Sequence, residues 1–326
     1  MNIYKNLIII LSFLLIISCV KQQHHVATNQ DIPFNIWKEE LYQEAIIQGF
    51  NKALLTQIFA LIQKSPAYLA QDIKQFKKQT FSEYYLNAVN NLRIKKAKDR
   101  IKKHNKILTQ IEQKYLVPKE YIISLWAIES DFGDNQGNYH VVNALANLAF
   151  NSRRKALFKK EFFASLTILS TENITPKDLK GSWAGATGQC QFLPSTYLAY
   201  AVDFNGDNKK DIWHNKDDIM ASIANYLSSL KWDHNIPWGY EIKNIPNLTK
   251  LANKRKYLLK DLKAKYQIDK IDNAAFSSYE LEKKVTIITY EDRFFVTFKN
   301  FDVIKIWNNS SYFALTVGLL ANQIKE

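Results

Sequence analysis

The sequence contains little cysteine for its length. Two cysteines occur in 326 residues, and Cys19 closes an apolar stretch at the N-terminus. If Cys19 is modified there, only Cys190 remains, so an intramolecular disulfide is excluded and the fold must be stabilised by its hydrophobic core. Cys190 has no histidine or cysteine nearby at ligand spacing. We therefore expect a small buried residue at Cys190 rather than a thiol nucleophile.

Long apolar runs are also scarce, and the clearest one lies at the N-terminus. Residues 7–17 form an apolar run that follows Lys5. The run is too short to span a bilayer comfortably, and a positively charged start before it is typical of a secretory signal. The sequence therefore predicts export, with a plain signal anchor as the alternative.

The end of this run carries a further signal. The segment Ile16-Ile17-Ser18-Cys19 resembles the lipobox of bacterial lipoproteins. This resemblance implies a signal peptide over residues 1–18, a lipid anchor on Cys19, and a polar tether over residues 19–33. Val20 after the cysteine, rather than aspartate, is similar to lipoproteins sorted to the outer membrane. We thus expect a protein tethered to the periplasmic face of the outer membrane of a Gram-negative-type envelope.

Acidic residues are fewer than basic ones, 31 against 44, which leaves a net charge of +13. Exported proteins rarely meet nucleic acid, so no nucleic-acid partner is expected. The excess suits an anionic surface such as phospholipid headgroups or an acidic cell-wall polymer. Much of it lies on solvated helix faces such as residues 93–103, so it defines no binding site. The oligomeric state is not defined by the sequence, and a monomer is expected.

Helical periodicity dominates the chain, which predicts a mainly α fold with a small β part. Leu92 is expected among the inward residues of the long basic segment that ends at Tyr115. The expected helices cover about residues 34–49, 51–65, 81–115, 118–133, 141–150, 153–169 and 218–230, and others begin at Thr175 and at Asn308 or Ser310. Asn51 is expected to cap the second of these helices.

A β-hairpin is expected near the C-terminal end. Residues 285–290 and 293–298 are β-rich and are separated only by Glu291 and Asp292. This spacing predicts a hairpin, although Glu-Asp is not a favoured turn pair. Residues 253–284 carry the weakest pattern and are assigned to a peripheral lobe.

One carboxylate lies on an apolar helix face near the middle of the chain. A helix expected to begin at Pro118 and to end at Gly133 places Glu129 in line with three large apolar side chains, at i, i+3, i+4 and i+7: Ile122, Leu125 and Trp126. The helix dipole and desolvation both raise the pKa of a carboxyl group there. A raised pKa is what a general acid needs near neutral pH. The alternative is a helix-end glutamate that turns to solvent or pairs with a lysine.

A glycine-rich segment over residues 181–197 follows. Three glycines among small residues imply a close approach of the backbone, either to a ligand or to a packed helix. Ser182, Gln189 and Gln191 supply neutral donors and acceptors there, which are the groups that recognise sugar hydroxyls and acetamides.

An acidic loop predicts either a cation site or a capping turn. Oxygen side chains occur at alternate positions, at Asp203, Asn205, Asp207 and Asp211, which is the spacing of a loop that wraps a hard cation. Asn208 stands where glycine is usual, and asparagine tolerates a positive φ. His214 stands where a bidentate glutamate is expected, so Asp217 or Asp218 would supply the missing carboxylate. The alternative is an Asx-rich turn that caps the next helix. The two predictions for this loop are therefore a structural Ca²⁺ or a capping turn, and no other cofactor is required.

Together these stretches resemble the lytic murein transglycosylase B family of periplasmic lipoproteins. They occur in the family's order between about Phe34 and Ile324: Trp126–Gly133, Ala144–Phe150 followed by Arg153 and Arg154, Gly181–Ser195, Ala201–Asp207, Ala221–Leu227, Pro237–Glu241 and Trp307–Ala314. The resemblance implies a lysozyme-like catalytic core over about residues 117–240 and 300–326. It also implies a helical lobe over about 34–116 and a peripheral lobe with the hairpin over about 241–299, all within a catalytic region of 34–326.

The resemblance also implies an activity on peptidoglycan. The family cleaves the β-1,4 bond between N-acetylmuramic acid and N-acetylglucosamine and leaves a 1,6-anhydro end. Glu129 matches its single general acid and base. Ser182, Gln191, Tyr226 and Asn308 match positions that line the glycan cleft, and the loop at Asp203 matches a cation site. Asn208, His214 and Cys190 depart from the family pattern; the first two weaken the cation assignment.

The sequence shows no second acidic residue with a clear claim to a catalytic role. Ordinary glycosidases use two carboxylates roughly 5–9.5 Å apart, whereas Asp131 points away from Glu129 on a helix and is expected at the helix end or the surface. An intramolecular hydroxyl nucleophile removes the need for a second acid. The alternatives are a hydrolytic muramidase with the same cleft and a non-catalytic peptidoglycan-binding lipoprotein.

Overall fold

A computed structural model describes residues 32–74, 79–245, 248–252 and 255–325. The expected signal peptide, the lipidation of Cys19 and nearly all of the tether lie outside the described residues. Within them, none of the helices has the length and apolar character that a membrane span requires.

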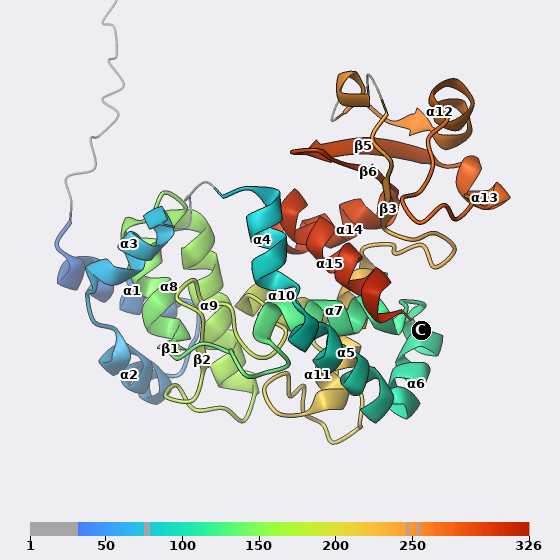
Figure 1. Cartoon of the computed structure of the whole chain (residues 1–326). Helices are drawn as coiled ribbons and strands as arrows, with labels where there is room; N and C mark the ends of the chain where they lie inside the picture. The colour runs from blue at the N-terminus through green and yellow to red at the C-terminus, as the bar shows by residue number, and fades with distance from the viewer. Residues whose placement is uncertain (1–31, 75–78, 246–247, 253–254, 326) are drawn as a thin grey trace, which may run out of the picture.

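The described chain is mainly helical with small antiparallel sheets, as predicted (Figure 1). Its helices are α1 Phe34–Ile47, α2 Lys52–Leu61, α3 Pro66–Lys74, α4 Phe81–Ala88, α5 Asn91–Lys103, α6 Asn105–Tyr115, α7 Lys119–Ser130, α8 Val141–Asn151, α9 Lys155–Thr171, α10 Pro194–Tyr200, α11 Lys216–Ser229, α12 Leu259–Tyr266, α13 Ser278–Leu281, α14 Lys299–Asn308 and α15 Ser311–Ile324. Its strands are β1 Tyr139–His140, β2 Lys180–Gly181, β3 Gly239–Ile242, β4 Tyr257–Leu258, β5 Lys284–Tyr290 and β6 Arg293–Thr297.

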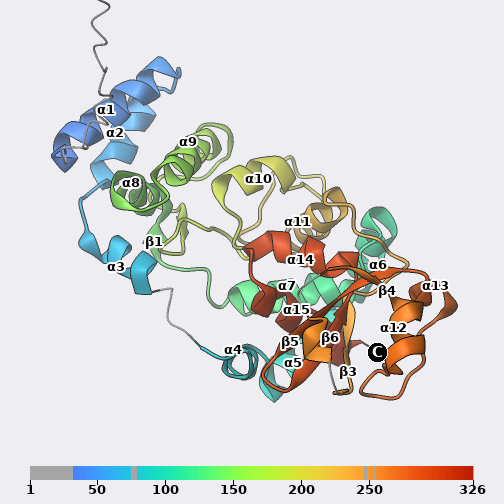
Figure 2. The same ribbon diagram turned by 90° about the horizontal axis from the view of Figure 1, so that it is seen from above.

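Three hydrophobic clusters organise these elements. The helices α1 and α2 pack with α8 and α9 at one end of the molecule, and β3–β6 with α12 form the cluster at the other end (Figures 1 and 2). Between them, the central cluster contains α7, which lies against α5, α6, α11 and α15. The helix that carries Glu129 is therefore the centre of the fold. The lobe limits expected from the resemblance remain predictions.

The basic segment expected as one helix over 81–115 is three helices. Asn90 has an extended backbone, and its side chain accepts a hydrogen bond from the Arg93 N–H at 2.9 Å, so it ends α4 and caps α5. Because the helix is interrupted at Asn90, the residues after the break face the core in a different pattern from the one expected of a continuous helix. The prediction for Leu92 was wrong for this reason, because its side chain is 65% exposed.

Two helix starts also differ from expectation. Thr175 does not cap a helix; its hydroxyl bonds the N–H and carboxylate of Asp178 in a turn that leads into β2. Pro118 occupies the N-cap of α7 rather than its first helical position. Asn51 caps α2 as predicted, and Ser310 rather than Asn308 caps α15.

The predicted hairpin is present as β5 and β6, in a sheet of strand order β3-β6-β5-β4. Its turn uses Glu291 in the left-handed region, with φ 54°. The Glu291 carboxylate accepts hydrogen bonds from the Phe81 N–H at 2.8 Å and the Ser82 hydroxyl at 2.7 Å. Because these groups lie at the start of α4, the unusual turn residue caps that helix and joins the peripheral lobe to the core.

Candidate active site

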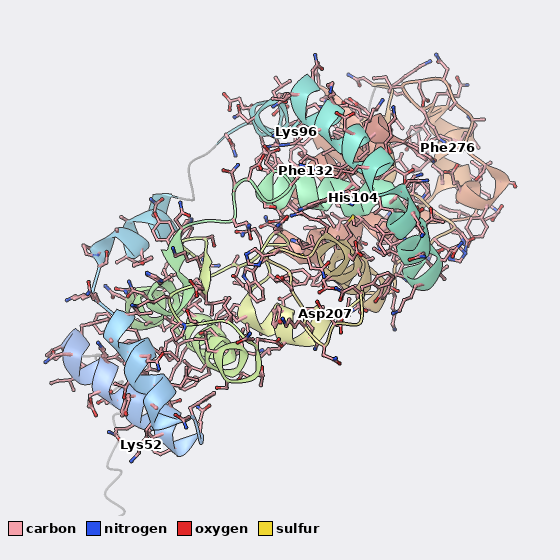
Figure 3. The ribbon with its side chains drawn as sticks, turned by 90° about the horizontal axis from the view of Figure 1, so that it is seen from below. Lys52, Lys96, His104, Phe132, Asp207 and Phe276 are labelled. Carbon is pink, nitrogen blue, oxygen red and sulfur yellow. The ribbon has the colours of Figure 1, made fainter. Side chains whose placement is uncertain are left out.

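The helix α7 ends at Ser130, before the expected Gly133. Asp131 adopts a left-handed conformation with φ 48°, and its N–H bonds the Ala127 carbonyl at 3.0 Å. Its carboxylate pairs with Arg93 at 3.2 Å and Lys96 at 2.9 Å, both on α5. Figure 3 labels Lys96 on this helix. Asp131 is thus a helix-end residue that is held away from Glu129, as predicted.

Glu129 lies in the last turn of α7, one residue before this end, in surroundings that disfavour its charge. Burial raises the pKa of Glu129 to about 8, and a side-chain hydrogen bond from Trp307 opposes part of the rise. Its Oε1 atom is buried without a hydrogen-bond partner. Among the described residues, no cation pairs with Glu129 and no second carboxylate contributes to its pKa. The geometry therefore disagrees with a glutamate that turns to solvent or pairs with a lysine.

Two further titratable groups lie close enough to Glu129 to sense its charge. Tyr84 on α4 has a pKa raised to about 12, first by burial and then by Glu129. Burial and the same carboxylate raise the pKa of the Cys190 thiol, which is buried and contacts the Ile219 carbonyl. Cys190 is the small buried residue that was expected. Tyr84 was missed, because nothing in the sequence connects a tyrosine on α4 with a glutamate on α7.

Trp307 links Glu129 to Tyr226 and Asn308, which are two of the expected glycan-binding residues. Its ring lies 4.6 Å from that of Tyr226 and 5.3 Å from that of Phe192, measured between centroids. Tyr226 is buried on α11, whereas the next residue after Trp307, Asn308, is exposed at the end of α14. Trp307 itself was not singled out, although it opens the motif that contains Asn308.

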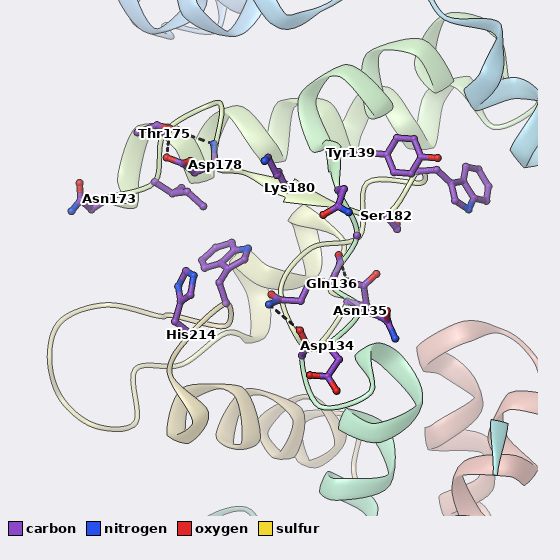
Figure 4. Close-up of a pocket in the computed structure, with 17 residues that line it drawn as sticks. Asp134, Asn135, Gln136, Tyr139, Asn173, Thr175, Asp178, Lys180, Ser182 and His214 are labelled. Atoms are coloured by element: carbon purple, nitrogen blue, oxygen red, sulfur yellow. Dashed lines mark hydrogen bonds between the residues drawn. The ribbon is translucent and has the colours of Figure 1, made fainter. Parts of the chain in front are cut away.

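Ser182 and Gln191 lie on a neighbouring wall. Both line a cavity of about 870 Å³ with the loop that follows α7, and Figure 4 shows Ser182 and Tyr139 on one side of it and His214 on the other. The Gln191 amide donates to the Gln136 carbonyl at 3.0 Å, and its backbone is left-handed with φ 49°. Glu129, Tyr226 and Asn308 do not line this cavity. The backbone from Cys190 through Gln191 to Phe192 joins the residues of this cavity to those around Glu129 and Trp307.

Gln189 does not offer its side chain to a ligand. Its Oε1 accepts hydrogen bonds from the Trp126 indole and the Lys216 ammonium, both at 3.0 Å, and its Nε2 donates to the Trp213 carbonyl at 2.6 Å. The expectation that Gln189 reads sugar groups was wrong, because all these contacts are internal. Its role is to connect α7 with the loop before α11.

The acidic loop combines a capping turn with a cluster of carboxylates. Asp203 accepts hydrogen bonds from the Gly206 and Asn208 N–H groups, both at 2.7 Å, and Asn208 has the positive φ expected, 66°. Oxygens of Asp203, Asp207 and Asp218 lie within 4.8 Å of one another. Asp211 instead accepts from the Trp213 and His214 N–H groups.

The chain was also compared with known proteins. The family model described as "Transglycosylase SLT domain" matches residues 33–322. The chain belongs to this family. The resemblance stated from the motifs is thereby confirmed, and the transglycosylase family accounts for nearly the whole folded region.

Individual members of the transglycosylase family show how far the similarity extends. The membrane-bound lytic murein transglycosylase B of Escherichia coli is 40% identical over 126 residues, which are 38% of this chain and 35% of that protein. The match thus spans about a third of this relative. Crystal structures of SltB3 from Pseudomonas aeruginosa, in complex with NAG-NAM-pentapeptide and with NAG-anhNAM-pentapeptide, are 31% identical with TM-scores of 0.84 and 0.83, and cover 89% of this chain and 79% of SltB3.

A more distant structure shares the fold. The lytic transglycosylase Slt35 of Escherichia coli, in complex with calcium, has a TM-score of 0.77 at 24% identity and covers 88% of this chain and 92% of Slt35. At this identity the likeness concerns the fold alone.

Proposed function

We propose that this protein is a peptidoglycan lytic transglycosylase that cleaves the MurNAc-β-1,4-GlcNAc bond and leaves a 1,6-anhydro-MurNAc end. The observation that carries the proposal is Glu129, a half-buried residue without a charged partner among the described residues, whose Oε1 atom is buried and whose pKa is raised to about 8. SltB3, which shares the fold, was crystallised with an anhNAM-containing ligand, and this supports the same product here.

In the proposed reaction Glu129 acts twice. Its carboxyl group donates a proton to the glycosidic oxygen while the bond from that oxygen to C1 breaks. The 6-hydroxyl oxygen of the same muramic acid then bonds C1, and the Glu129 carboxylate takes the hydroxyl proton, which restores the acid. No water is consumed, so the second carboxylate of a hydrolytic glycosidase is unnecessary. A carboxyl group of pKa about 8 holds its proton at neutral pH, as the first step requires.

The remaining expected residues are proposed to bind the glycan. Ser182 and Gln191 would hold sugar hydroxyls and acetamides from the cavity wall that they line, and Asn308 would do so from the end of α14. Tyr226 would place an aromatic face along the chain. Trp307 and Tyr84 join this set because they border Glu129. The enzyme would reach its substrate from the periplasmic face of the outer membrane, tethered through Cys19.

Product analysis tests the activity. We expect mass spectrometry of digested sacculi to show 1,6-anhydro-MurNAc ends in place of reducing ends, since the nucleophile is internal to the sugar. Reducing MurNAc ends would instead identify a hydrolytic muramidase. Sacculi that bind the protein but stay intact would identify a non-catalytic binding lipoprotein.

The acidic loop is proposed to hold a structural Ca²⁺. The ligand set expected from the sequence is Asp203, Asn205, Asp207, Asp211 and Asp218, and the donors are hard oxygens, which Ca²⁺ prefers. The close approach of the Asp203, Asp207 and Asp218 oxygens supports the proposal, because their repulsion would be relieved by a cation. A bound ion would brace the loop that precedes α11.

Calcium is therefore expected to raise the Tm of the protein. A ligand at 100 times its Kd stabilises the folded state by about 2.7 kcal/mol, which should raise the Tm by several degrees. Asp203→Ala should abolish the rise, while Asp99→Ala, which removes an exposed aspartate paired with Lys95, should keep it. An equal Tm with and without Ca²⁺ in the unaltered protein would favour a simple capping turn.

A further inference from the structure

Gln189 lies in a closed turn of the glycine-rich segment. The Thr187 N–H donates to the Phe192 carbonyl at 2.8 Å, and the Phe192 N–H donates back to the Thr187 carbonyl at 3.1 Å. Gly188 and Gln191 take the positive φ values, 68° and 49°, that let the chain reverse between these two bonds. The turn is therefore a single unit, and the position of Gln189 sets that of Gln191.

The helix α7 is attached to this turn at two points, both on Gln189. The Trp126 indole donates to the Gln189 Oε1 at 3.0 Å, and the Ser130 hydroxyl donates to the Gln189 main-chain carbonyl at 2.8 Å. Trp126 and Ser130 are four residues apart, so they lie on one face of the helix, and Glu129 lies between them along the chain. Gln189 thus holds the turn of α7 that carries Glu129.

The loop that leads into α11 binds the rest of Gln189. The Gln189 Nε2 donates to the Trp213 carbonyl at 2.6 Å, and its Oε1 also accepts from the Lys216 ammonium at 3.0 Å. Its main-chain N–H donates to the Ile212 carbonyl at 2.8 Å. The residue is 3% exposed, so these bonds are shielded from water. Because it is bound from both α7 and this loop, the amide has little freedom to move.

The loop after α7 also packs on this side chain. Gly133 has φ 95°, and a Cβ atom placed on it would lie 2.4 Å from the Gln189 Oε1 and 2.5 Å from its Cδ. The Gly133 N–H donates at 3.0 Å to the Ser130 hydroxyl, which is the hydroxyl that donates to the Gln189 carbonyl. The end of α7, the loop after it and the closed turn thus meet at one residue.

We propose that Gln189 is a positioning residue for glycan cleavage: it sets the distance between Glu129, which acts on the glycosidic oxygen, and Gln191, which holds the sugar. The inference rests on the proposed function. The Gln189 side chain acts through these two residues, because its own contacts are internal. A misplacement of about 1 Å in an active site can lower the rate ~10²-fold. A residue that joins the two sides of the site can therefore control turnover without touching the glycan.

Gln189→Met tests the proposal, because methionine is similarly long and flexible but cannot form these hydrogen bonds. Turnover of saturating sacculi, measured as turbidity loss, is expected to fall about 10–10²-fold with KM unchanged, since the residues that contact the glycan remain. Ser130→Ala removes the second link to α7 and suits a helix, so it should also lower turnover and decides the question if Gln189→Met does not fold. Full turnover in either folded variant would overturn the proposal.

Asn147→Leu is the matched control. Asn147 is another buried amide, 7% exposed, whose Oδ1 accepts from the Ser65 N–H at 2.8 Å and whose Nδ2 donates to the Gln63 carbonyl at 2.9 Å. It joins α8 to the segment before α3, at the end of the molecule where α1 and α2 pack. Both substitutions should lower the Tm, but Asn147→Leu should leave turnover unchanged. Equal losses of turnover in Gln189→Met and Asn147→Leu would show that Gln189 is merely structural.

The pKa of Glu129 provides a readout that does not need lytic activity. It follows from the pH dependence of the free energy of unfolding, relative to the same chain with Glu129→Gln. In Gln189→Met we expect this pKa to move from about 8 toward 4.5, since a displaced carboxyl group gains water, whereas Asn147→Leu should keep it. If the unaltered protein released no fragments from sacculi, the proposed function would fail. An unchanged pKa in Gln189→Met would instead contradict the role of Gln189.

Discussion

Glu129→Gln is expected to abolish the release of soluble fragments from sacculi. The amide cannot donate a proton to the glycosidic oxygen or accept one from the 6-hydroxyl, and the described residues around it include no second carboxylate that could replace it. A loss of about 10²–10⁴-fold in rate is expected, because this is the usual contribution of a general acid–base group. The measurement is the fall in turbidity of a sacculus suspension. Glu40→Gln, an exposed position on α1, should keep full activity.

The same substitution should also change how the free energy of unfolding depends on pH, which tests Glu129 independently of catalysis. The pKa of Glu129 is about 8 in the folded protein and near 4.5 when unperturbed. Between these values the folded state binds more protons than the unfolded state, so the free energy of unfolding falls as pH rises. Glutamine cannot ionise, and the variant lacks this loss.

We therefore expect Glu129→Gln to be more stable than the unaltered protein at pH 8 and nearly equal to it below pH 4.5. The difference should grow by at most about 1.4 kcal/mol for each pH unit between those limits. Urea denaturation at several pH values measures it. A stability difference that does not change with pH would contradict the buried, protonated state of Glu129, and unchanged turbidity loss would contradict the mechanism.

Gly137→Ala is expected to be the most damaging glycine substitution near the site. Gly137 has a positive φ of 87°, and a Cβ atom there would lie 2.1 Å from the Gly181 carbonyl oxygen and 2.3 Å from its carbon. Because these are backbone atoms of β2, the loop after α7 would have to separate from the strand before Ser182. The combined cost of the conformation and the displacement is about 2–5 kcal/mol, and activity should fall with it.

Gly49→Ala is the control for this substitution. Gly49 has almost the same φ, 88°, but nothing lies within 4 Å of a Cβ atom placed there. Only the conformational cost of about 1–2 kcal/mol should remain. Comparison of the two urea midpoints isolates the contact between the loop and β2. Equal destabilisation by the two changes would show that this close approach does not matter.

Local sequence patterns predicted much of the secondary structure. Asn51 as a cap, the apolar face of α7 and the β5–β6 hairpin could be read correctly because each depends on residues that are neighbours along the chain or on one helix face. The errors arose where a single polar residue changed the outcome. Asn90 broke a periodic helix and exposed Leu92, and Thr175 satisfied its hydrogen bonds in a turn.

The candidate site was only partly open to prediction. The glycine-rich segment and the motif at Trp307 were visible as patterns, but the partners of their side chains were not. Gln189 and Gln191 look equivalent in the sequence. In the structure the Gln189 side chain bonds the Trp126 indole of α7, whereas Gln191 lies on a cavity wall. Tyr84 comes from a separate helix, and its proximity to Glu129 results from packing across a long sequence separation.

For Glu129, the sequence alone determined that a carboxylate shares a helix face with large apolar residues, because a spacing of three and four residues brings side chains together in any α-helix. It also determined the family, through motifs in a common order. Only the tertiary structure decided that one oxygen of this carboxylate is buried, that Trp307 contacts the carboxylate and that Asp131 is held away by Arg93 and Lys96. Desolvation and ion pairing depend on which distant segments meet, and that is decided by the packing of the whole chain.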